Sequence, residues 1–511
     1  MNIYQFFQKS CTTFSDQFAY SYEDININYF ELKERVDKQS ALLISNGVSK
    51  GDLVGIYSSN PLHSVINYFS LLRIGAVCVP INFEDQRFSL EKILKQINTK
   101  HFIVTQDLMH QLTPFISENS ILFCSDLDCI FIKNGSKLVE NTNFAFNPLL
   151  LETPSTPNDI DPAFIFFTSG STGIPKGVIL SHKNILHYII EGSRRYKVAN
   201  DDVFLCQPGL HFDISLFSIL TPFTNGGKCI LIPPHLRSNP LYLIETIHKY
   251  NVSVLYLVPS VIKLITQSIQ NKTDLYSVRV LISSGEKIEA ADITSFKTHF
   301  ANSTIFNIYG NTEANDSFVY QLAEDFNEET ILPIGSPLPY VRPILLNEHG
   351  EQCAEGEVGE LFLQSETLML GYHKIQDSHA FVKLDGFEGL FFPTKDLILK
   401  KDNQYYYFGR KDKMVKINGH RVNPLQIEEV IKKLSFVEEV AVSMDQNHSP
   451  THLIAIIYSK HFYSSSDLRR HCAKYLPAVA IPKEFRIIDC PLPKTSNGKI
   501  DYKAINQIYE K

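Results

Sequence analysis

Short apolar segments alternate with segments of helical periodicity along most of the chain. Buried strands are predicted for the segments DLVGIYS (52–58), AVCVPIN (76–82), HFIVTQ (101–106), AFIFFT (163–168) and KCILIP (228–233). Helices are predicted for PLHSVINYFSLLRIG (61–75) and NPLYLIETIHKY (239–250). Strands that alternate with helices predict the α/β fold class, with largely parallel sheets flanked by helices.

The amino-acid composition of the chain changes near residue 400. At 511 residues it is long enough for two or more domains, each with its own core. The stretch 399–434 is charged, carries turn signals and then starts a helix at Pro424. In that helix, apolar residues recur with helical spacing at Ile427, Val430, Ile431 and Leu434. We therefore predict a large domain over residues 1–409 and a smaller one over residues 410–511.

Charge and cysteine usage exclude several classes of protein. The formal net charge of −7 gives no bias toward nucleic acid or a membrane surface. No stretch approaches 18 apolar residues, and the start of the chain lacks a basic segment followed by an apolar run. The nine cysteines are scattered without a CxxC motif, which argues against a zinc ribbon or a disulfide framework. We expect a cytoplasmic protein with no nucleic-acid and no membrane partner.

The stretch FIFFTSGSTGIPKGVILSH (164–182) has the composition of a phosphate-binding loop. Its glycines let backbone N–H groups converge, its hydroxyls donate hydrogen bonds and its lysine supplies a positive charge. It is not a Walker A motif, because Gly177 follows Lys176 where Ser or Thr should stand. The alternative is a flexible hairpin loop, but the spacing TSGSTGxPKG favours phosphate binding.

Further motifs follow this loop in a fixed order. They are NIYGNTE (307–313), GEVGELFLQSETLMLGY (356–372), PTKDL (393–397), FGRKDKMVKINGHRVN (408–423) and PKTSNGKID (493–501). Together with the loop, they resemble the signature of the adenylate-forming (ANL) superfamily over essentially the whole chain. That superfamily includes acyl- and aryl-CoA ligases, luciferases and the adenylation domains of nonribosomal peptide synthesis.

The resemblance implies a ligase that uses ATP and Mg²⁺. Such an enzyme activates a carboxylate to an acyl-adenylate with release of pyrophosphate and then transfers the acyl group to a thiol. The resemblance also implies that the C-terminal domain is small, mobile and of α+β type, with Asp412 at its hinge. A non-catalytic nucleotide sensor on the same fold would be expected to lack Lys499 or Glu313, and both residues are present.

The resemblance assigns chemical roles to residues at the matching motif positions. Thr312 would contact the α-phosphate, Glu313 would hold Mg²⁺, and Lys499 would offset the negative charge between phosphate and carboxylate. Tyr309 would stack on adenine, and Asp396 would accept the two ribose hydroxyls. The other nucleotide-binding residues implied are Thr168, Ser169, Gly170, Ser171, Thr172, Gly173, Lys176, Asn307, Gly310, Arg410 and Lys416. The family usually has Gly at the position of Lys395, which is a departure.

Two interpretations of the substrate arise from the stretch 207–233. Its FDIS segment resembles the FDxS of amino-acid-activating members, in which the Asp, here Asp213, pairs with the α-ammonium of the substrate. Its PGLH segment resembles the PxxH of CoA ligases, in which His211 would line an acyl pocket. FDIS favours an amino acid, because a buried aspartate without a partner is unfavourable unless an ammonium group binds it. An acyl- or aryl-CoA ligase, or a luciferase-like oxidase, is the alternative.

On the amino-acid interpretation, the family's substrate positions carry over to a mostly apolar pocket. It would be lined by Asp213, Ile214, Phe217, Tyr256, Leu281, Ser283, Ile308, Asp316, Ser317 and Lys499. Asp316, as a second carboxylate, indicates a polar or basic side chain, or an amino group away from the α-carbon, unless it points outward into solvent. No carrier segment follows residue 511, so we expect a free-standing enzyme. Its acceptor would be the phosphopantetheine thiol of a separate carrier protein, or CoA.

Overall fold

The computed structural model divides the chain into two compact units. It describes residues 1–84, 90–141, 147, 157–168, 175–269, 275–288, 290–323, 331–374, 380–411, 415–417, 420–445, 452–461, 463–476, 478–495 and 500–509. The first unit is Met1–Pro343 with Leu363–Phe392, and the second is Ile344–Phe362 with Pro393–Lys511. The domain boundary expected between residues 409 and 410 coincides with the end of strand β22 (Gln404–Arg410) and remains a prediction.

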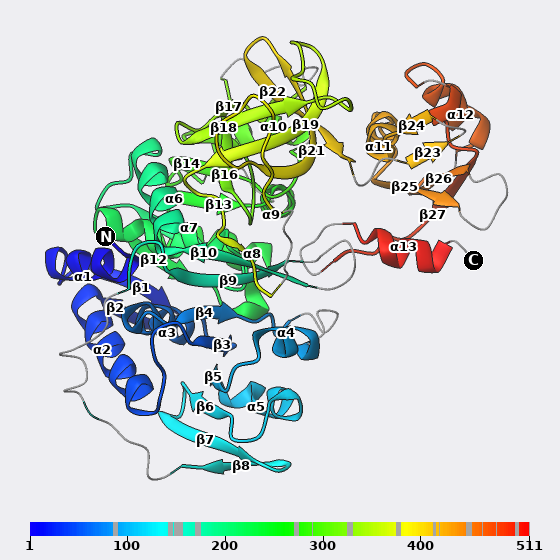
Figure 1. The fold of residues 1–511 in the computed structure, drawn as a ribbon. Coiled ribbons are helices and arrows are strands. Elements are labelled where there is room, and N and C mark those ends of the chain that lie inside the picture. Colours follow the sequence, from blue (N-terminus) through cyan, green and yellow to red (C-terminus); the bar gives the residue numbers. More distant parts are fainter. Residues whose placement is uncertain are drawn as a thin grey trace. The chain divides into compact units, whose positions relative to one another are not determined.

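The first unit contains a nine-stranded sheet in the order β17-β16-β15-β14-β13-β11-β12-β1-β2 (Figure 1). Neighbouring strands are parallel from β15 across to β1, whereas β2, β16 and β17 are antiparallel at the two edges. The strands are β1 (Phe18–Tyr22), β2 (Ile25–Asn28), β11 (Val203–Cys206), β12 (Lys228–Leu231), β13 (Val254–Leu257), β14 (Val280–Ser283), β15 (Thr304–Asn311), β16 (Asn315–Gln321) and β17 (Ser336–Pro337).

A second nine-stranded sheet of this unit has the order β20-β10-β9-β4-β3-β5-β6-β7-β8. Its centre, from β9 to β6, is parallel, and its edges are antiparallel. The strands are β3 (Leu53–Tyr57), β4 (Val77–Pro80), β5 (His101–Val104), β6 (Ile121–Cys124), β7 (Cys129–Asn134), β8 (Lys137–Glu140), β9 (Pro162–Thr168), β10 (Lys176–Ser181) and β20 (Gly371–Tyr372). The predicted phosphate-binding loop therefore joins two antiparallel strands, β9 and β10.

Helices cover both faces of each sheet, which confirms the predicted α/β class. One hydrophobic core joins the facing sides of the two sheets with the helices α1 (Ile3–Thr13), α2 (Tyr29–Ser45), α3 (Pro61–Ile74), α6 (His182–Arg195) and α7 (Ser215–Leu220). A second core packs the other face of the first sheet against α8 (Pro240–Tyr250), α9 (Pro259–Ser268) and α10 (Ala290–His299). A third packs the other face of the second sheet against α4 (Leu90–Ile97) and α5 (Met109–Leu112).

The predicted helix over 61–75 shows how local signals set its ends. The side chain of Asn60 accepts a hydrogen bond from the backbone of His63, and Pro61 occupies the first helical position, where no amide donor is needed. Gly75 ends the helix with φ of 80°, a left-handed conformation that favours glycine. These two caps explain why the helix ends within one residue of the predicted limit.

The second unit ends in a small α+β fold, as the resemblance implied. Its three-stranded sheet is formed by β25 (Glu439–Asp445), β26 (His452–Tyr458) and β27 (Glu484–Ile488). Helices α11 (Pro424–Lys432) and α12 (Ser465–Cys472) pack on one face and α13 (Tyr502–Tyr509) on the other. The other strands that belong to this unit wholly or in part are β18 (Val341–Leu346), β19 (Val358–Ser365), β21 (Phe392–Lys401), β23 (Val415–Ile417) and β24 (His420–Val422). The predicted apolar stripe of α11 is confirmed, because Ile427, Val430 and Ile431 are buried.

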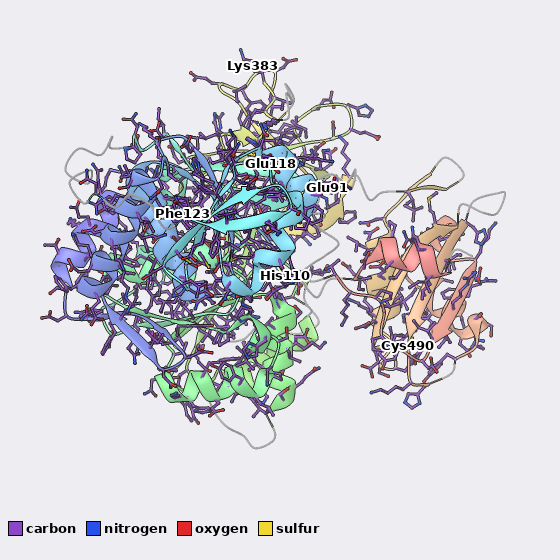
Figure 2. The ribbon with its side chains drawn as sticks, turned by 90° about the horizontal axis from the view of Figure 1, so that it is seen from below. Glu91, His110, Glu118, Phe123, Lys383 and Cys490 are labelled. Carbon is purple, nitrogen blue, oxygen red and sulfur yellow. The ribbon has the colours of Figure 1, made fainter. Side chains whose placement is uncertain are left out.

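Side chains fill the interior of each unit (Figure 2). Phe123 of β6 lies within the first unit and is fully buried, whereas Cys490 is exposed on the second unit. None of the described helices combines the length and the apolar character needed to cross a membrane.

Candidate active site

The loop between β11 and α7 carries both candidate substrate residues, His211 and Asp213. It follows the carboxyl end of a parallel strand, which is where ligands commonly bind in α/β sheets. The loop is held by its own backbone: the Phe212 N–H donates to Gly209 O at 2.9 Å. The hydroxyl of Ser215 in turn donates to Phe212 O at 2.6 Å. The loop therefore presents the two side chains from a fixed turn rather than from a free segment.

Asp213 is a half-buried carboxylate that is held by two hydrogen bonds. The Ile214 N–H donates to its Oδ1 at 3.0 Å, and the Thr312 hydroxyl donates to the same carboxyl group. Burial raises the pKa of Asp213 to about 6, although these two hydrogen bonds favour its charged form. No Lys, Arg or His among the described residues forms an ion pair with it. Asp213 is thus a negative group that lacks a positive partner in the part of the chain that is described.

Asp316 lies on β16, and only 8% of its surface is exposed. The interpretation in which it points outward into solvent is therefore wrong. The Tyr256 hydroxyl donates to Asp316 Oδ1 at 2.6 Å. Burial raises the pKa of Asp316 to about 7, and the negative charge of Asp213 contributes to this rise. The two carboxyl groups, which we call the aspartate pair, are therefore close enough to influence each other's ionisation.

Aromatic side chains surround the aspartate pair. The rings of Phe217 on α7 and Tyr256 on β13 lie 5.1 Å apart in an edge-to-face arrangement. Phe217 also contacts the rings of Tyr188 on α6 and of Tyr196, the residue that follows α6, each with its centroid 5.7 Å away. Ile308 of β15 is buried in the same core, and Ile214 packs against it. The predicted apolar residues Ile214, Phe217, Tyr256 and Ile308 are thus brought together.

The two residues predicted on β14 do not join this group. In the parallel register Tyr256 lies opposite Ile282, and Leu281 lies opposite Leu255. Leu281 packs in the second core with Leu255, on the other face of the sheet from Tyr256. Side chains alternate between the two faces of a strand, so Ser283 shares the face of Leu281. The predicted assignment of Leu281 and Ser283 to the substrate pocket is therefore wrong by one position.

Ile282 and Ser284 are the residues that sequence reasoning missed on this strand. Ile282 is buried in the same core as Tyr256, and the Ser284 hydroxyl is hydrogen-bonded to the Tyr256 hydroxyl. A shift by one residue between two similar segments exchanges the faces of a strand, which explains the error. The alternation of buried residues in the assembled sheet is the signal that finds them.

The turn between β15 and β16 carries Thr312 and Glu313 and contacts β20, the strand next to β10. The Tyr372 hydroxyl donates to Glu313 Oε1 at 2.8 Å. Lys176 Nζ lies 4.8 Å from the centre of the Tyr372 ring, within the range of a cation–π contact. Thr168 pairs with Lys176 across β9 and β10. Tyr372, the last residue of the motif 356–372, to which no role was assigned, therefore links the carboxylate and the lysine predicted to bind Mg²⁺ and phosphate.

Other residues in and near the adenine motif form contacts with neighbouring residues of the protein. Asn307 Nδ2 donates to Pro333 O at 2.9 Å, and the Tyr309 ring contacts Phe318 at 5.7 Å. Ser317 Oγ, predicted to line the pocket, donates to Asn315 O at 3.3 Å. A Cβ at Gly310 would lie 2.3 Å from the backbone oxygen of Asn315, so glycine is needed there for the two strands to approach.

Asp396, the predicted ribose ligand, lies on β21 in the second unit. It is buried, and Arg410 Nη1 lies 3.2 Å from its Oδ1 across the β21–β22 pair. The Thr394 hydroxyl accepts the Asp396 N–H at 3.0 Å. Lys395 has a φ of 62°, a left-handed conformation that favours glycine, which is the residue that the resemblance implies at this position. The departure therefore leaves the backbone path of the motif in place.

Several predicted site residues lie outside the described part of the chain. They are Ser169, Gly170, Ser171, Thr172, Gly173, Asp412 and Lys499, together with the side chain of Lys416. Among the residues that the structure describes, no group of three or more His, Cys, Asp or Glu side chains is arranged to hold a metal ion.

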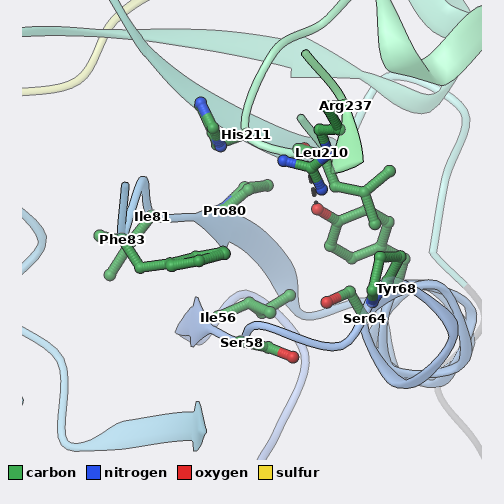
Figure 3. A pocket seen from close by; sticks show the side chains of 11 residues that line it. Ile56, Ser58, Ser64, Tyr68, Pro80, Ile81, Phe83, Leu210, His211 and Arg237 are labelled. Atoms are coloured by element: carbon green, nitrogen blue, oxygen red, sulfur yellow. Dashed lines mark hydrogen bonds between the residues drawn. The ribbon is translucent and has the colours of Figure 1, made fainter. Parts of the chain in front are cut away.

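His211 faces a different environment from Asp213. It lines a cavity of about 20 Å³ with Ser64, Tyr68 and Arg237, and the Tyr68 hydroxyl donates to Leu210 O at 2.9 Å (Figure 3). The His211 ring lies 4.1 Å from that of Phe212. Arg237 is buried and pairs with Glu84 at 3.1 Å. The aspartate pair does not line this cavity, which we call the histidine cavity.

Comparison with known proteins matches the geometry to a family. The family model described as AMP-binding enzyme matches residues 7–373, and the one described as AMP-binding enzyme C-terminal domain matches residues 426–499. The chain is 28% identical over 489 residues to the L-proline–[L-prolyl-carrier protein] ligase of Pseudomonas fluorescens, covering 94% of this chain and 93% of that protein.

Two further relatives extend the comparison. The chain is 26% identical over 513 residues to Tyrocidine synthase 3 of Brevibacillus parabrevis, covering 99% of this chain but only 8% of that much longer protein. The structure of Klebsiella oxytoca NpsA in complex with 3-hydroxyanthranilyl-AMSN aligns with a TM-score of 0.79 and 25% identity, covering 100% of this chain and 99% of that one. The chain therefore spans nearly the whole length of some relatives and a small part of others.

Proposed function

Since this chain belongs to the family of AMP-binding enzymes, we propose that it activates an amino acid as its adenylate and loads it onto a separate carrier protein. The chain is an AMP-forming ligase of the adenylate-forming superfamily. In the first step a carboxylate oxygen attacks the α-phosphorus of ATP, and the bond to pyrophosphate breaks. In the second step the phosphopantetheine thiol attacks the acyl carbon, and AMP leaves.

The observation that supports an amino-acid substrate is the unpaired charge of Asp213. An ionised carboxylate surrounded by aromatic side chains is unfavourable unless a positive group compensates it. The described residues supply two hydrogen bonds to Asp213 but no cation. An α-ammonium group has the missing charge and donates hydrogen bonds, so an amino acid fits where a fatty or aryl acid does not.

His211 gives no comparable support to an acyl-CoA ligase. It lines a cavity of about 20 Å³, which is too small for an acyl chain, and the charge of Arg237 beside it is paired with Glu84. We therefore assign Asp213, and not His211, as the residue that contacts the substrate.

Lys176, Thr312, Tyr372 and Glu313 support a site for ATP and Mg²⁺. Glu313 is only partly buried, and its carboxylate accepts a hydrogen bond from Tyr372 at 2.8 Å. Mg²⁺ is commonly held by one or two carboxylates together with phosphate oxygens and water, and this arrangement fits that requirement. Bound Mg²⁺ would neutralise phosphate charge, and Lys176 would attract the departing phosphates. Thr312 would contact the α-phosphate while it holds Asp213 in position.

Residues of the second unit complete the proposed roles. Asp396, fixed by Arg410 and Thr394, would accept the ribose hydroxyls, and Lys499 would neutralise the α-phosphate and the substrate carboxylate. Asp412 would serve as the hinge on which the second unit turns between the two steps.

The thiol acceptor is proposed from a relative, and the cytoplasmic location is proposed from the free cysteines. The proline-activating relative is by its name a carrier-protein ligase, and this chain spans 93% of its length. We therefore propose phosphopantetheine on a separate carrier protein, rather than CoA, as the acceptor. All nine cysteines are free thiols, which is compatible with a reducing cytoplasm.

Amino-acid-dependent exchange of pyrophosphate into ATP tests the first step. The panel should contain the standard amino acids, each with its des-amino acid, and a set of fatty and aryl acids. We expect exchange with one or a few amino acids and none with their des-amino analogues. Exchange with fatty or aryl acids alone would contradict the proposal. The second step is tested by the yield of thioester on candidate carrier proteins and on CoA, and efficient turnover with CoA alone would contradict the proposed acceptor.

A further inference from the structure

We infer that the amino acid activated by this enzyme carries a second ammonium group, which binds to Asp316 while its α-ammonium binds to Asp213. This inference names the substrate class and rests on the proposed function. The substrate would accordingly be a diamino carboxylic acid rather than a neutral or aromatic amino acid.

Asp316 is a buried side chain whose hydrogen-bonding capacity is only half used. Its surface is 8% exposed, and its Oδ1 accepts the Tyr256 hydroxyl at 2.6 Å. Within the described parts of the chain, Oδ2 receives no hydrogen bond and no ion pair. A carboxylate has about four acceptor positions, and leaving them empty in a buried place is unfavourable. The free oxygen therefore has room for a donor that the protein does not supply.

The cation that lowers the pKa of Asp316, Arg195, already forms an ion pair with another carboxylate. Arg195 on α6 lowers the pKa of Asp316, but its Nη2 lies 2.9 Å from Glu191 Oε1 in an ion pair. The negative charge of Asp316 also raises the pKa of four tyrosines, which are Tyr188, Tyr196, Tyr256 and Tyr340. Burial raises the pKa of all four hydroxyls, so they stay neutral and cannot compensate a carboxylate.

The aspartate pair calls for two positive charges rather than one. Burial raises the pKa of both carboxyl groups, and the negative charge of Asp213 raises the pKa of Asp316 further. With a substrate that has a single ammonium group, one of the two carboxyl groups would have to stay protonated or carry an unpaired charge. Because an unpaired buried charge is strongly unfavourable, the second carboxylate selects for a second cation.

The positions of the two residues indicate which ammonium each one binds. Asp213 is half-buried and is hydrogen-bonded to Thr312, the residue proposed to contact the α-phosphate. The reacting carboxylate and its α-ammonium must therefore lie near Asp213. Asp316 is more deeply buried and is anchored to Tyr256, which packs on Phe217. The side chain of the substrate would extend toward Asp316 and end there in its second ammonium group.

The test compares diamino acids with neutral isosteres in pyrophosphate exchange. The pairs are 2,3-diaminopropionate with 2-aminobutyrate, 2,4-diaminobutyrate with norvaline, ornithine with norleucine, and lysine with 2-aminoheptanoate. We expect the preferred diamino acid to exceed its isostere in kcat/KM by about tenfold or more, since close charge pairs couple at least this strongly. In Asp316→Asn this ratio should fall by about tenfold, because the variant removes the charge that favours the diamino acid over its isostere.

Asp316→Glu is the conservative variant for the same test. It keeps the charge and reaches one methylene further, so it should keep the preference for a cation but shift it to a shorter diamino acid. It also keeps the inference testable if Asp316→Asn does not fold.

The outcomes separate the two proposals. A wild-type enzyme that prefers the neutral isosteres, or a ratio unchanged in Asp316→Asn, overturns the inference and leaves amino-acid activation standing. A wild-type enzyme that activates des-amino acids but no amino acid overturns the proposed function itself.

Discussion

One short loop supplies His211 to the histidine cavity and Asp213 to the aspartate pair, and the two regions differ in how a buried charge is compensated. In the histidine cavity, the buried guanidinium of Arg237 is paired with Glu84 at 3.1 Å. In the aspartate pair, two carboxyl groups receive hydrogen bonds from Thr312 and Tyr256 but no cation from the described residues. The positive charge of Arg237 is thus paired within the protein, whereas the two carboxyl groups have no cation among the described residues.

This difference separates residues that stabilise the fold from residues that await a ligand. A compensated buried pair brings its own counter-charge, and nothing further has to bind. An uncompensated buried carboxylate lowers stability in the free protein, and such groups are found where function requires them. Charge balance therefore distinguishes His211 from Asp213, although their two motifs, PGLH and FDIS, follow one another directly in the sequence.

The largest effect is expected from Asp213→Ala. The variant leaves the α-ammonium of the substrate without a partner, and breaking such a pair typically costs about 3–5 kcal/mol. We expect kcat/KM for the preferred amino acid to fall by a factor of about 10² to 10³. The des-amino acid should be activated comparatively better, because the carboxylate that excluded it has been removed. Pyrophosphate exchange with both acids, in wild type and variant, measures this; indifference to the substitution would remove Asp213 from the substrate site.

The next effect concerns the stability of the free protein and its dependence on pH. The pKa of Asp316 is raised from 3.8 to about 7 in the folded state. Between these values the unfolded chain loses this proton before the folded chain does, so the free energy of unfolding falls as pH rises. The loss is complete above about pH 7, with an upper bound of about 4 kcal/mol.

Asp316→Asn should remove this penalty. The amide oxygen still accepts the Tyr256 hydrogen bond, but the group no longer ionises. We expect the variant to be more stable than wild type by about 2 kcal/mol at pH 8, with the advantage shrinking toward pH 4. Urea unfolding at several pH values measures the difference. An Asp316→Asn variant that is less stable at pH 8 would mean that the carboxylate is compensated in the free protein.

A smaller effect, of opposite sign, is expected in the histidine cavity. Arg237→Met keeps much of the aliphatic stem but removes the pair with Glu84, which is partly exposed and regains water. We expect the free energy of unfolding to fall by about 1 kcal/mol, with kcat/KM changed less than about threefold. The control is Glu84→Gln alone and combined with Arg237→Met, since the double variant should lose little beyond Arg237→Met. A loss of activity without a loss of stability would show that the cavity binds substrate.

The fold was largely predictable because its signals are local. The alternation of apolar strands with helices and the stripe Ile427, Val430 and Ile431 are readable within short windows of sequence. The α/β class and the predicted helix of α11 followed from them. Capping by Asn60 and Gly75 is equally local, which is why the limits of α3 were close to those predicted.

The site was less predictable because it depends on how strands are paired. Leu281 and Ser283 were assigned one position away from Ile282 and Ser284, and only the register with β13 shows which of these residues share the face of Tyr256. The direction of Asp316 likewise depends on the turn before β16. Asn315, the first residue of β16, has a φ of 53°, a conformation that no local pattern had indicated.

The smallest effect is expected from His211→Ala. This variant tests whether the histidine cavity, and not the aspartate pair, contacts the substrate. The His211 ring packs 4.1 Å from Phe212 and lines a cavity beside Arg237, so its removal takes away packing rather than a contact with substrate. We expect kcat/KM for the preferred amino acid to change less than about threefold, which corresponds to under about 0.7 kcal/mol of transition-state stabilisation. The assay is pyrophosphate exchange run beside Asp213→Ala, which lies on the same loop and is therefore a matched control for any disturbance of that loop. If His211→Ala instead lowers kcat/KM tenfold or more while Asp213→Ala does not, the loop presents its histidine and not its aspartate to the substrate, and the enzyme is an acyl- or aryl-CoA ligase.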